Sequence, residues 1–181
     1  MRIFVFSDTH GDTTGMDLVI SRAAPDMIIH CGDGADDAAE IHQKYPNIEM
    51  YIVRGNSDKY FDVEQEKYLH IMGHTIYYTH GDTFNHGKGV TRSDSESEIV
   101  RYARQHGADI VLHGHTHIAM FSFENGVYLM NPGSASLKKP NDYRPSFGCI
   151  ELFEGNVIVK ILSVEVFEIL TPVQVAQNFM Q

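Results

Sequence analysis

The sequence is poor in basic residues: its 181 residues include 14 lysines and arginines against 24 aspartates and glutamates, which gives a formal net charge of −10. This balance excludes a broad nucleic-acid-binding surface and adsorption to an anionic membrane, because both need a basic surface that neutralises phosphate. It leaves an anionic substrate possible, since bound metal cations can reverse the local charge inside an acidic protein.

Cysteines and long apolar runs are also scarce. The two cysteines, Cys31 and Cys149, lie in short apolar runs, which predicts buried, reduced thiols rather than a disulfide or a metal pair. No stretch approaches the roughly 20 apolar residues that cross a bilayer. The apolar run at residues 3–6 is too short for a signal peptide and is soon followed by Asp8. We therefore expect one soluble, cytoplasmic domain over residues 1–181.

The first third of the chain alternates short apolar runs with amphipathic segments. The apolar runs predict strands at residues 3–6, 27–31 and 50–53, and the segments between them predict helices at 16–24 and 36–44. Repeated strand–helix–strand units imply right-handed crossovers and a parallel sheet. The polar loops that follow the strands would then share one edge of that sheet, where open α/β proteins place their sites.

The rest of the chain changes from α/β to mostly antiparallel β. Asn125-Gly126 and the segment 154–156 have the composition of hairpin turns, and Ser95 and Glu98 form a capping box that predicts a helix start. Two packed sheets with helices outside would accommodate both halves of the chain. The remaining expected elements are strands at 67–72, 75–79 and 109–112, a surface loop at 83–94, a helix end at Gly107, and a terminal helix from Thr171.

Polar residues of one chemical kind follow five of the expected strands. Carboxylate oxygen and imidazole nitrogen together suit Mn²⁺, Fe²⁺ or Zn²⁺, and the lack of a cysteine among them argues against a closed thiolate site. Seven ligands are too many for one tetrahedral ion and so indicate two. Two ions roughly 3.5–4 Å apart would bind a phosphoryl group and generate a hydroxide. The candidate ligands are Asp8, His10, Asp33, Asn56, His80, His115 and His117, with the glycine-flanked Asp33 as the bridging group.

These residues lie in short blocks that resemble, in order and spacing, the five blocks of the calcineurin-like metallophosphoesterases, in particular their small bacterial and archaeal phosphodiesterase branch (the YfcE type). The blocks are Asp8-Thr9-His10, Gly32-Asp33, Gly55-Asn56, His80-Gly81 and Gly114-His115-Thr116-His117. The resemblance implies an α/β fold, a four-layer αββα sandwich of two mixed sheets. It also implies hydrolysis of phosphodiesters by a hydroxide held at a dinuclear centre, with Mn²⁺ as the expected metal and Fe²⁺, Ni²⁺ or Zn²⁺ as alternatives.

The resemblance further implies how the ligands divide. Asp8, His10, Asp33 and His117 would hold one ion, and Asp33, Asn56, His80 and His115 the other, so that Asp33 bridges both ions. That bridge agrees with the one chosen above from the chemistry of the residues.

The third block departs from the family pattern. Many members of the family carry a histidine after Gly-Asn, which is thought to protonate the leaving group, whereas Ser57 stands here. Without a general acid, departure of an alkoxide would be about 10²–10⁴-fold slower, and diesters with good leaving groups would suffer least. Asp58 and His86 are candidates to replace the acid. Ser57, Arg54 and His86 are expected near the substrate.

Three functions stay open at this point: a phosphodiesterase, a phosphomonoesterase or nucleotidase, and a catalytically weak interaction module that resembles the retromer scaffold subunit. All seven ligand positions are filled, which favours an enzyme with a small phosphodiester or nucleotide-like substrate. A homodimer or higher homo-oligomer is possible through the aromatic side chains of Tyr60 and Phe61. His30 and His113 lie within or at the end of apolar strands, and we expect them to be buried, hydrogen-bonded histidines rather than ligands.

Overall fold

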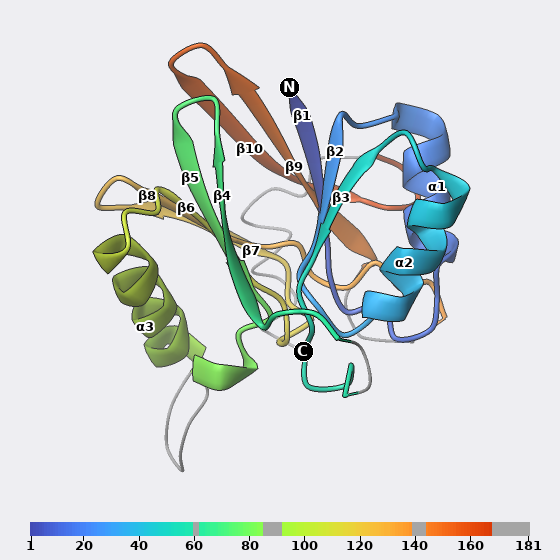
Figure 1. Ribbon diagram of the computed structural model, residues 1–181, viewed down its shortest axis with the longest axis horizontal. Coiled ribbons are helices and arrows are strands. Elements are labelled where there is room, and N and C mark those ends of the chain that lie inside the picture. Colours follow the sequence, from blue (N-terminus) through green and yellow to red (C-terminus); the bar gives the residue numbers. More distant parts are fainter. Residues whose placement is uncertain (60–61, 85–91, 139–143, 168–181) are drawn as a thin grey trace.

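The computed structural model describes residues 1–59, 62–84, 92–138 and 144–167, without the side chains of 92–94. Within these residues two five-stranded mixed sheets pack face to face, and helices cover both outer sides (Figure 1). The expected four-layer αββα sandwich is therefore confirmed. Among the described residues, no helix has the length and apolar character that crossing a membrane requires.

Sheet A has the strand order β10-β9-β1-β2-β3. The crossover helices α1 (Thr14–Ala23) and α2 (Ala35–Lys44) make β1 (Arg2–Phe6), β2 (Met27–His30) and β3 (Glu49–Ile52) parallel to one another, as the strand–helix–strand pattern predicts. The second predicted hairpin, β9 (Ser146–Phe153) and β10 (Asn156–Ser163), adds to the free side of β1 in antiparallel orientation.

Sheet B has the order β4-β5-β6-β8-β7. Its parallel centre consists of β5 (His74–Thr79), β6 (Ile110–Leu112) and β8 (Val127–Asn131), and antiparallel partners β4 (Glu66–Ile71) and β7 (Met120–Glu124) form its edges. The turn between β7 and β8 places Asn125 at φ 53° and Gly126 at φ 81°, the left-handed pair that an Asn-Gly hairpin turn requires.

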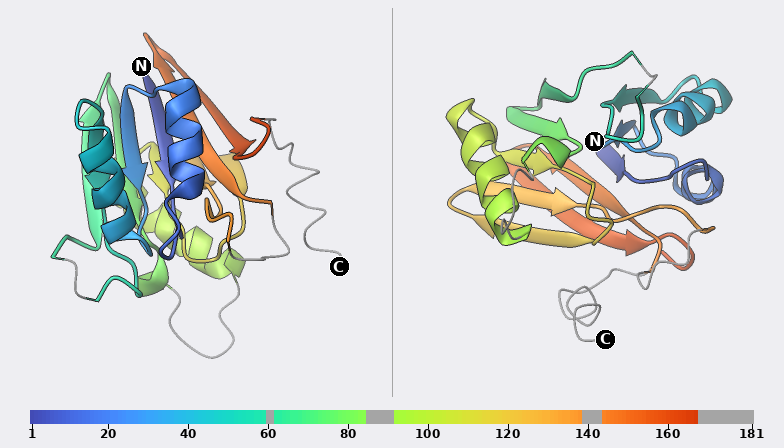
Figure 2. Two further views of the ribbon diagram at one scale, coloured as in Figure 1. Left: turned by 90° about the vertical axis from the view of Figure 1, so that its right-hand side faces the viewer. Right: turned by 90° about the horizontal axis from the view of Figure 1, so that it is seen from below.

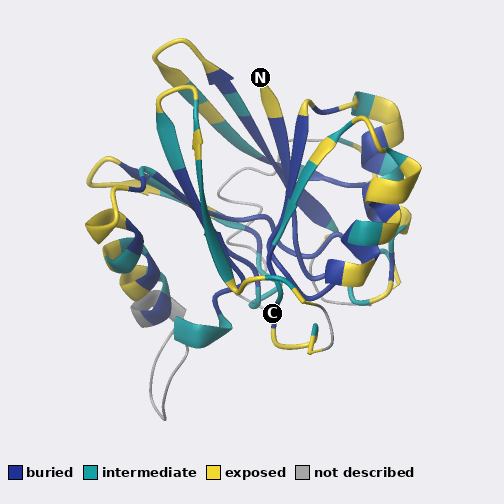
Figure 3. Cartoon of the chain, in the orientation of Figure 1, coloured by how far each residue is buried: buried dark blue, intermediate teal, exposed yellow. Residues whose placement is uncertain are grey.

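The main core lies between the two sheets, where the central strands β1, β2, β6 and β9 are buried along most of their length (Figure 3). A second cluster packs α1 and α2 onto sheet A, and both helices lie across its outer face (Figure 2, left). On the other outer side, α3 (Arg92–Gln105) packs on sheet B through Ile99 and Ala103. Cys31 and Cys149 are buried and free, as predicted.

One predicted helix start is wrong. Helix α3 begins at Arg92, so Ser95 and Glu98 lie inside it rather than at its capping box. The residues just before Ser95 include neither glycine nor proline, so nothing prevents the helix from starting a turn earlier. The predicted loop at 83–94 is partly a short 3₁₀ turn, Asp82–Phe84. Residues 85–91, Tyr60, Phe61 and the predicted helix from Thr171 lie outside the described residues.

Candidate metal centre

The predicted ligands lie in the loops that follow β1, β2, β3, β5 and β6. These strands come from both sheets, and the loops after them gather at the lower centre of the molecule in Figure 1. Parallel strands present their carboxyl ends on the same side, which is why residues more than a hundred positions apart meet here. The sequence prediction that strand ends from most of the chain converge at one place is therefore realised in the fold.

Three ligands form one close group around the buried carboxylate of Asp8. The Nε2 atom of His117 lies 3.2 Å from Oδ1 of Asp8 and 3.1 Å from Nε2 of His10. Among the described residues, the fully buried Oδ1 of Asp8 forms no hydrogen bond of good geometry, although the His117 ring lies 3.2 Å away. A buried carboxylate oxygen without a well-formed hydrogen bond is costly unless a cation binds it, so this atom fits a metal ligand.

A second group forms around Asn56. Its Oδ1 atom lies 3.0 Å from Nδ1 of His115 and 3.2 Å from Nε2 of His80. The Nδ1–H of His80 donates to the carbonyl oxygen of Cys31 at 2.8 Å. That bond fixes the ring and leaves Nε2 as the nitrogen available to a metal, the arrangement that is typical of metal-binding histidines.

Asp33 lies between the two groups. Its Oδ2 atom is 3.7 Å from Nε2 of His10 and 3.5 Å from Nε2 of His80, so one carboxylate oxygen faces a histidine of each group. The donor atoms of Asp8, His10 and His117 lie within 4.8 Å of one another, and so do those of Asp8, Asp33 and His80. Oxygen and imidazole donors at this spacing fit divalent ions such as Mn²⁺ or Zn²⁺.

The backbone of the site is unusual. A left-handed φ, between 49° and 69°, occurs at five non-glycine ligands: Asp8, His10, Asp33, His115 and His117. Such conformations cost free energy for side chains with a Cβ atom and concentrate at functional sites, where surrounding contacts hold them.

Two glycines of the predicted blocks are required by close packing. A Cβ atom on Gly55 would lie 2.3 Å from Oδ1 of Asp33, and one on Gly114 would lie 1.9 Å from Oγ of Ser7. Neither contact leaves room for a side chain. These glycines therefore let neighbouring loops approach closely enough for the ligands to meet.

The electrostatics of the site favour cations. Burial opposes charge on Asp33, but its hydrogen bonds with His80 and Ser57 outweigh burial and hold its pKa below the usual range. Burial likewise raises the pKa of Asp8, but His117 and His80 lower it by a larger amount. The pKa of Asp8 is therefore also below its usual range. Burial lowers the pKa of His80, yet the carboxylates of Asp33 and Asp8 raise it to about 9. A metal at His80 would therefore have to displace a proton.

Asp58 does not have the geometry of the general acid considered from the sequence. Its carboxylate accepts four backbone N–H groups at 2.7–3.0 Å, from Asp33, Gly34, Ala35 and Gly55. Two oxygens offer about four lone-pair positions, so the carboxylate is saturated. The prediction of an acid at Asp58 is therefore wrong, because neighbouring loops use every acceptor position.

The other predicted substrate-side residues have different surroundings. Ser57 is exposed, and it donates both its backbone N–H and its hydroxyl to Asp33, at 2.7 and 2.9 Å. Arg54 is half-buried and directly precedes Gly55, and no hydrogen bond among the described residues joins its guanidinium to the ligands. His86 lies outside the described residues.

The sequence prediction missed residues that brace the ligand loops. The side-chain amide of Asn131 donates to the carbonyl oxygen of Gly114 at 2.7 Å and to Oγ1 of Thr116 at 3.0 Å. The hydroxyl of Ser134 donates to the carbonyl oxygen of Asp8 at 2.7 Å. The composition of Asn131-Pro132-Gly133-Ser134 predicts a tight turn, but it gives no signal of the contacts that this turn makes with the ligand loops.

His30 and His113 are buried, as predicted. The Nδ1 atom of His30 accepts from the N–H of Gly32 at 3.2 Å, and burial lowers the pKa of His30 to about 4. Nδ1 of His113 lies 3.2 Å from the carbonyl oxygen of Gly114. Neither ring belongs to the two ligand groups.

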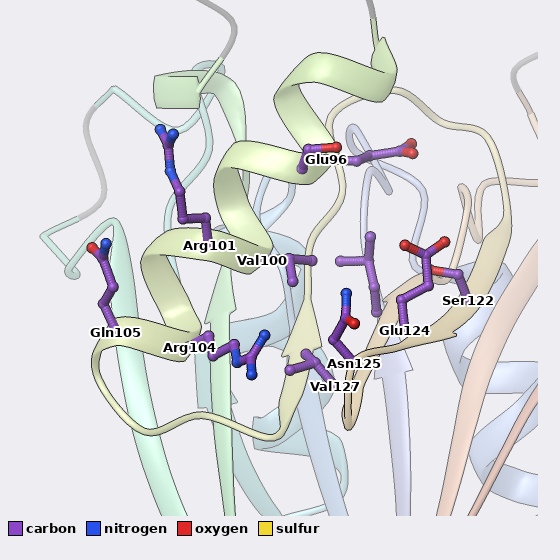
Figure 4. A pocket seen from close by; sticks show the side chains of 11 residues that line it. Glu96, Val100, Arg101, Arg104, Gln105, Ser122, Glu124, Asn125 and Val127 are labelled. Atoms are coloured by element: carbon purple, nitrogen blue, oxygen red, sulfur yellow. The ribbon is translucent and has the colours of Figure 1, made fainter.

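A hollow of about 610 Å³ lies elsewhere, between α3 and the β7–β8 hairpin (Figure 4). Val100, Val127 and Leu129 contribute its apolar surface, and Arg104 and Glu124 are among its charged side chains. None of the seven ligands lines it. The candidate chemistry is therefore at the metal centre rather than in this hollow.

Comparison with known proteins identifies the family. Residues 1–155 match the calcineurin-like phosphoesterase superfamily domain. The chain belongs to this family. It is 32% identical over 142 residues to a probable metallophosphoesterase, YsnB, of Bacillus subtilis, an alignment that covers 77% of this chain and 78% of that protein. The resemblance stated from the sequence blocks is thus confirmed, and the family is one of metal-dependent phosphoesterases.

Solved structures share the fold. A conserved uncharacterized protein of Streptococcus pneumoniae, described as a predicted phosphoesterase, superposes with a TM-score of 0.74 at 24% identity, covering 94% of this chain and 92% of that chain. Vps29 of Entamoeba histolytica, solved with Zn²⁺, gives a TM-score of 0.71 at 20% identity, covering 93% and 96%. At these identities the likeness establishes the fold and leaves the reaction to be argued from the site.

Proposed function

We propose that this protein is a phosphodiesterase with a dinuclear metal centre. The position of Asp33 carries the proposal, because its Oδ2 atom lies 3.7 Å from His10 and 3.5 Å from His80, one histidine of each ligand group. Asp8, His10, Asp33 and His117 would hold one ion, and Asp33, Asn56, His80 and His115 the other. Mn²⁺ is the metal we would test first, followed by Fe²⁺, Ni²⁺ and Zn²⁺.

The residues of the chain have different roles in such a site. Bound divalent ions would lower the pKa of a water molecule, and they would place positive charge opposite the phosphoryl oxygens of the substrate. Asp8 and Asp33, both with lowered pKa values, supply the negative charge that retains cations near neutral pH. The carbonyl oxygen of Cys31 holds the proton of His80 on Nδ1 and thereby keeps Nε2 directed toward Asp33 and Asn56.

A preference for diesters with good leaving groups follows from the residues after Asn56. Ser57 hydrogen-bonds to Asp33, and Asp58 is saturated by four backbone N–H groups, so neither offers a carboxylic or imidazolium proton. A leaving group that departs as a stable anion needs no such proton. Small nucleotide-like diesters and activated aryl diesters are the substrates that this site favours over simple alkyl monoesters.

The test is hydrolysis of bis(4-nitrophenyl) phosphate by metal-free protein to which Mn²⁺ is added. Asp33→Ala and His115→Ala should each abolish metal-dependent turnover. Asp36→Asn, which removes a similar charge from an exposed position of α2, should retain it. Full activity in either ligand variant would contradict the proposed function.

Two further measurements separate the alternatives. A higher rate with 4-nitrophenyl phosphate than with the diester, at equal metal loading, would indicate a monoesterase. Near-zero Mn, Fe, Ni and Zn in protein purified without chelator, together with no hydrolysis of either ester, would indicate an interaction module.

A further inference from the structure

Two carboxylates that are not among the seven ligands hold the backbone of the ligand loops. Asp37 lies in the first turn of α2 and is 6% exposed, and Asp58 lies half-buried in the loop after β3. From the sequence, Asp37 reads as an acid that suits a helix N-terminus. The structure gives each carboxylate a specific set of donors, and the two sets belong to different ligand loops.

Asp58 joins the loop that carries Asp33 to the loop that carries Asn56. Its Oδ2 atom accepts from the backbone N–H groups of Asp33 at 2.7 Å and of Gly55 at 2.8 Å. Its Oδ1 atom accepts from Gly34 at 2.9 Å and Ala35 at 3.0 Å. The Asp58 side chain thus fixes the backbone of Gly55, which precedes Asn56, and the backbone of Asp33, the proposed bridging ligand.

The amino end of α2 is capped by this carboxylate because its own N-cap residue has no side chain that could accept a hydrogen bond. Gly34 occupies the N-cap position, and a Cβ atom there would lie 1.8 Å from Oγ1 of Thr9. A side chain that could accept the orphan N–H groups of the first turn therefore has no room at this position. Asp58 supplies the cap from a loop on the neighbouring strand, where its negative charge also suits the helix dipole.

Asp37 holds a different loop. Its Oδ2 atom accepts from the hydroxyl of Thr9 at 2.6 Å and from the N–H of Gly11 at 2.7 Å. These two residues flank His10, whose φ of 49° is left-handed and has to be held by its surroundings. The donors to Asp37 thus lie on both sides of His10, whereas those to Asp58 lie at Asp33 and beside Asn56.

We propose that Asp58 and Asp37 are positioning residues with separate targets in the metal centre. Asp58 sets the affinity of the ion site that contains Asn56, His80 and His115, and Asp37 sets that of the site that contains Asp8, His10 and His117. The proposal rests on the dinuclear centre of the preceding section. Because Asp33 belongs to both sites, the effect of Asp58 extends to both ions but is larger at the site of Asn56.

The experiment measures metal binding rather than turnover. Zn²⁺ is titrated into metal-free wild type, Asp58→Asn and Asp37→Asn by calorimetry and by NMR of the histidine rings. The ring signals of His80 and His115 report one ion, and those of His10 and His117 report the other. Asparagine matches aspartate in size but places an NH₂ group against backbone N–H donors.

Asp58→Asn should weaken the ion reported by His80 and His115 by about 10–100-fold, and Asp37→Asn should do the same to the ion reported by His10 and His117. The exposed residues Glu40 and Asp62 provide matched controls, since Glu40→Gln and Asp62→Asn remove the same charge from α2 and from the β3–β4 loop. Both controls should bind two ions with wild-type affinity.

Circular dichroism of the metal-free variants checks that they fold. If an asparagine variant is unfolded, Asp58→Glu or Asp37→Glu replaces it, because glutamate keeps the charge and displaces the acceptor oxygens by one methylene. The expected pattern is the same, with smaller shifts.

Three results would overturn the inference: equal weakening of both ions by each variant, a larger weakening at the same histidine pair in both variants, or wild-type affinity in both. Wild-type protein that binds fewer than two Zn²⁺ ions would contradict the dinuclear centre itself. That result is obtained before any variant is compared, so the two failures are distinguishable.

Discussion

The two ends of the sandwich use the left-handed backbone conformation for different purposes. At one end lie the three hairpin turns, where Gly73, Gly126 and Gly155 have φ between 74° and 82°. A Cβ atom on any of these glycines would meet nothing within 4 Å. At the other end, non-glycine ligands adopt φ near 55°, and Gly55 and Gly114 are packed against ligand loops without space for a Cβ atom.

The difference shows what each glycine does. At the turn end, glycine serves the chain reversal alone, and the space around it is open. At the ligand end, glycine makes room for another loop, and the strained conformation falls on the residues that carry the chemistry. Substitutions at the two ends should therefore differ in size and in kind.

The largest expected difference is between Gly114→Ala and Gly126→Ala. Alanine at 114 would place its Cβ atom 1.9 Å from Oγ of Ser7 and 2.7 Å from Oδ2 of Asp8, so we expect a loss of about 3 kcal/mol or more in unfolding free energy. We also expect Gly114→Ala to lose Mn²⁺-dependent hydrolysis. Alanine at 126 meets open space and should cost about 1 kcal/mol through its positive φ alone, with activity retained.

Urea unfolding of the metal-free proteins and diester turnover with Mn²⁺ measure these effects. Equal destabilisation by the two alanines would show that backbone conformation, rather than close packing, determines how much a substitution at the ligand end lowers the unfolding free energy.

A smaller effect should appear in the pH dependence of stability through His30, which lies at the ligand end of β2. Burial lowers its pKa from 6.5 to about 4, so the unfolded chain binds the proton more readily between these values. Stability is therefore lost as pH falls below 6.5. The contribution of His30 to this loss should reach about 2 kcal/mol at pH 5.

Unfolding free energies of metal-free wild type and His30→Gln at pH 7.5 and pH 5 test this expectation. The variant should lose less stability over that interval than wild type does. An identical loss in both proteins would mean that other groups account for the pH dependence.

The smallest effect is expected for a histidine at the turn end. Nδ1 of His74 lies 2.6 Å from Oδ2 of Asp109, but the two side chains are 17% and 37% exposed. A partly solvated pair of this kind contributes about 0.5 kcal/mol, so His74→Gln should change the unfolding free energy little and leave Mn²⁺-dependent turnover intact. A loss of unfolding free energy above about 2 kcal/mol would show that the turn end tolerates substitution less well than the open space around its glycines indicates.

Much of the fold could be predicted because its signals are local. Continuous apolar runs predicted β1 and β2, and Asn125-Gly126 predicted the β7–β8 turn, since each depends on neighbouring residues alone. The sheet to which each C-terminal hairpin belongs had no such signal. Both hairpins are apolar with a polar turn, yet one completes sheet A beside β1 and the other completes sheet B beside β6.

The roles of individual side chains likewise depend on contacts that the local sequence does not show. A carboxylate in a polar loop has the same local sequence whether it donates a proton or caps a distant helix, so Asp58 was misassigned from sequence. The capping box at Ser95 failed for a related reason, because residues with adequate helix propensity precede it.

The sequence by itself determined the donor chemistry of the site: carboxylate and imidazole groups after successive strands, with glycines beside them. Tertiary structure alone decided which donor atom faces which neighbour. His115 presents Nδ1 to Asn56 and His117 presents Nε2 to Asp8, although only Thr116 separates them in the chain. The reason is physical: backbone conformation and contacts from distant loops orient these rings, and local sequence does not encode those contacts.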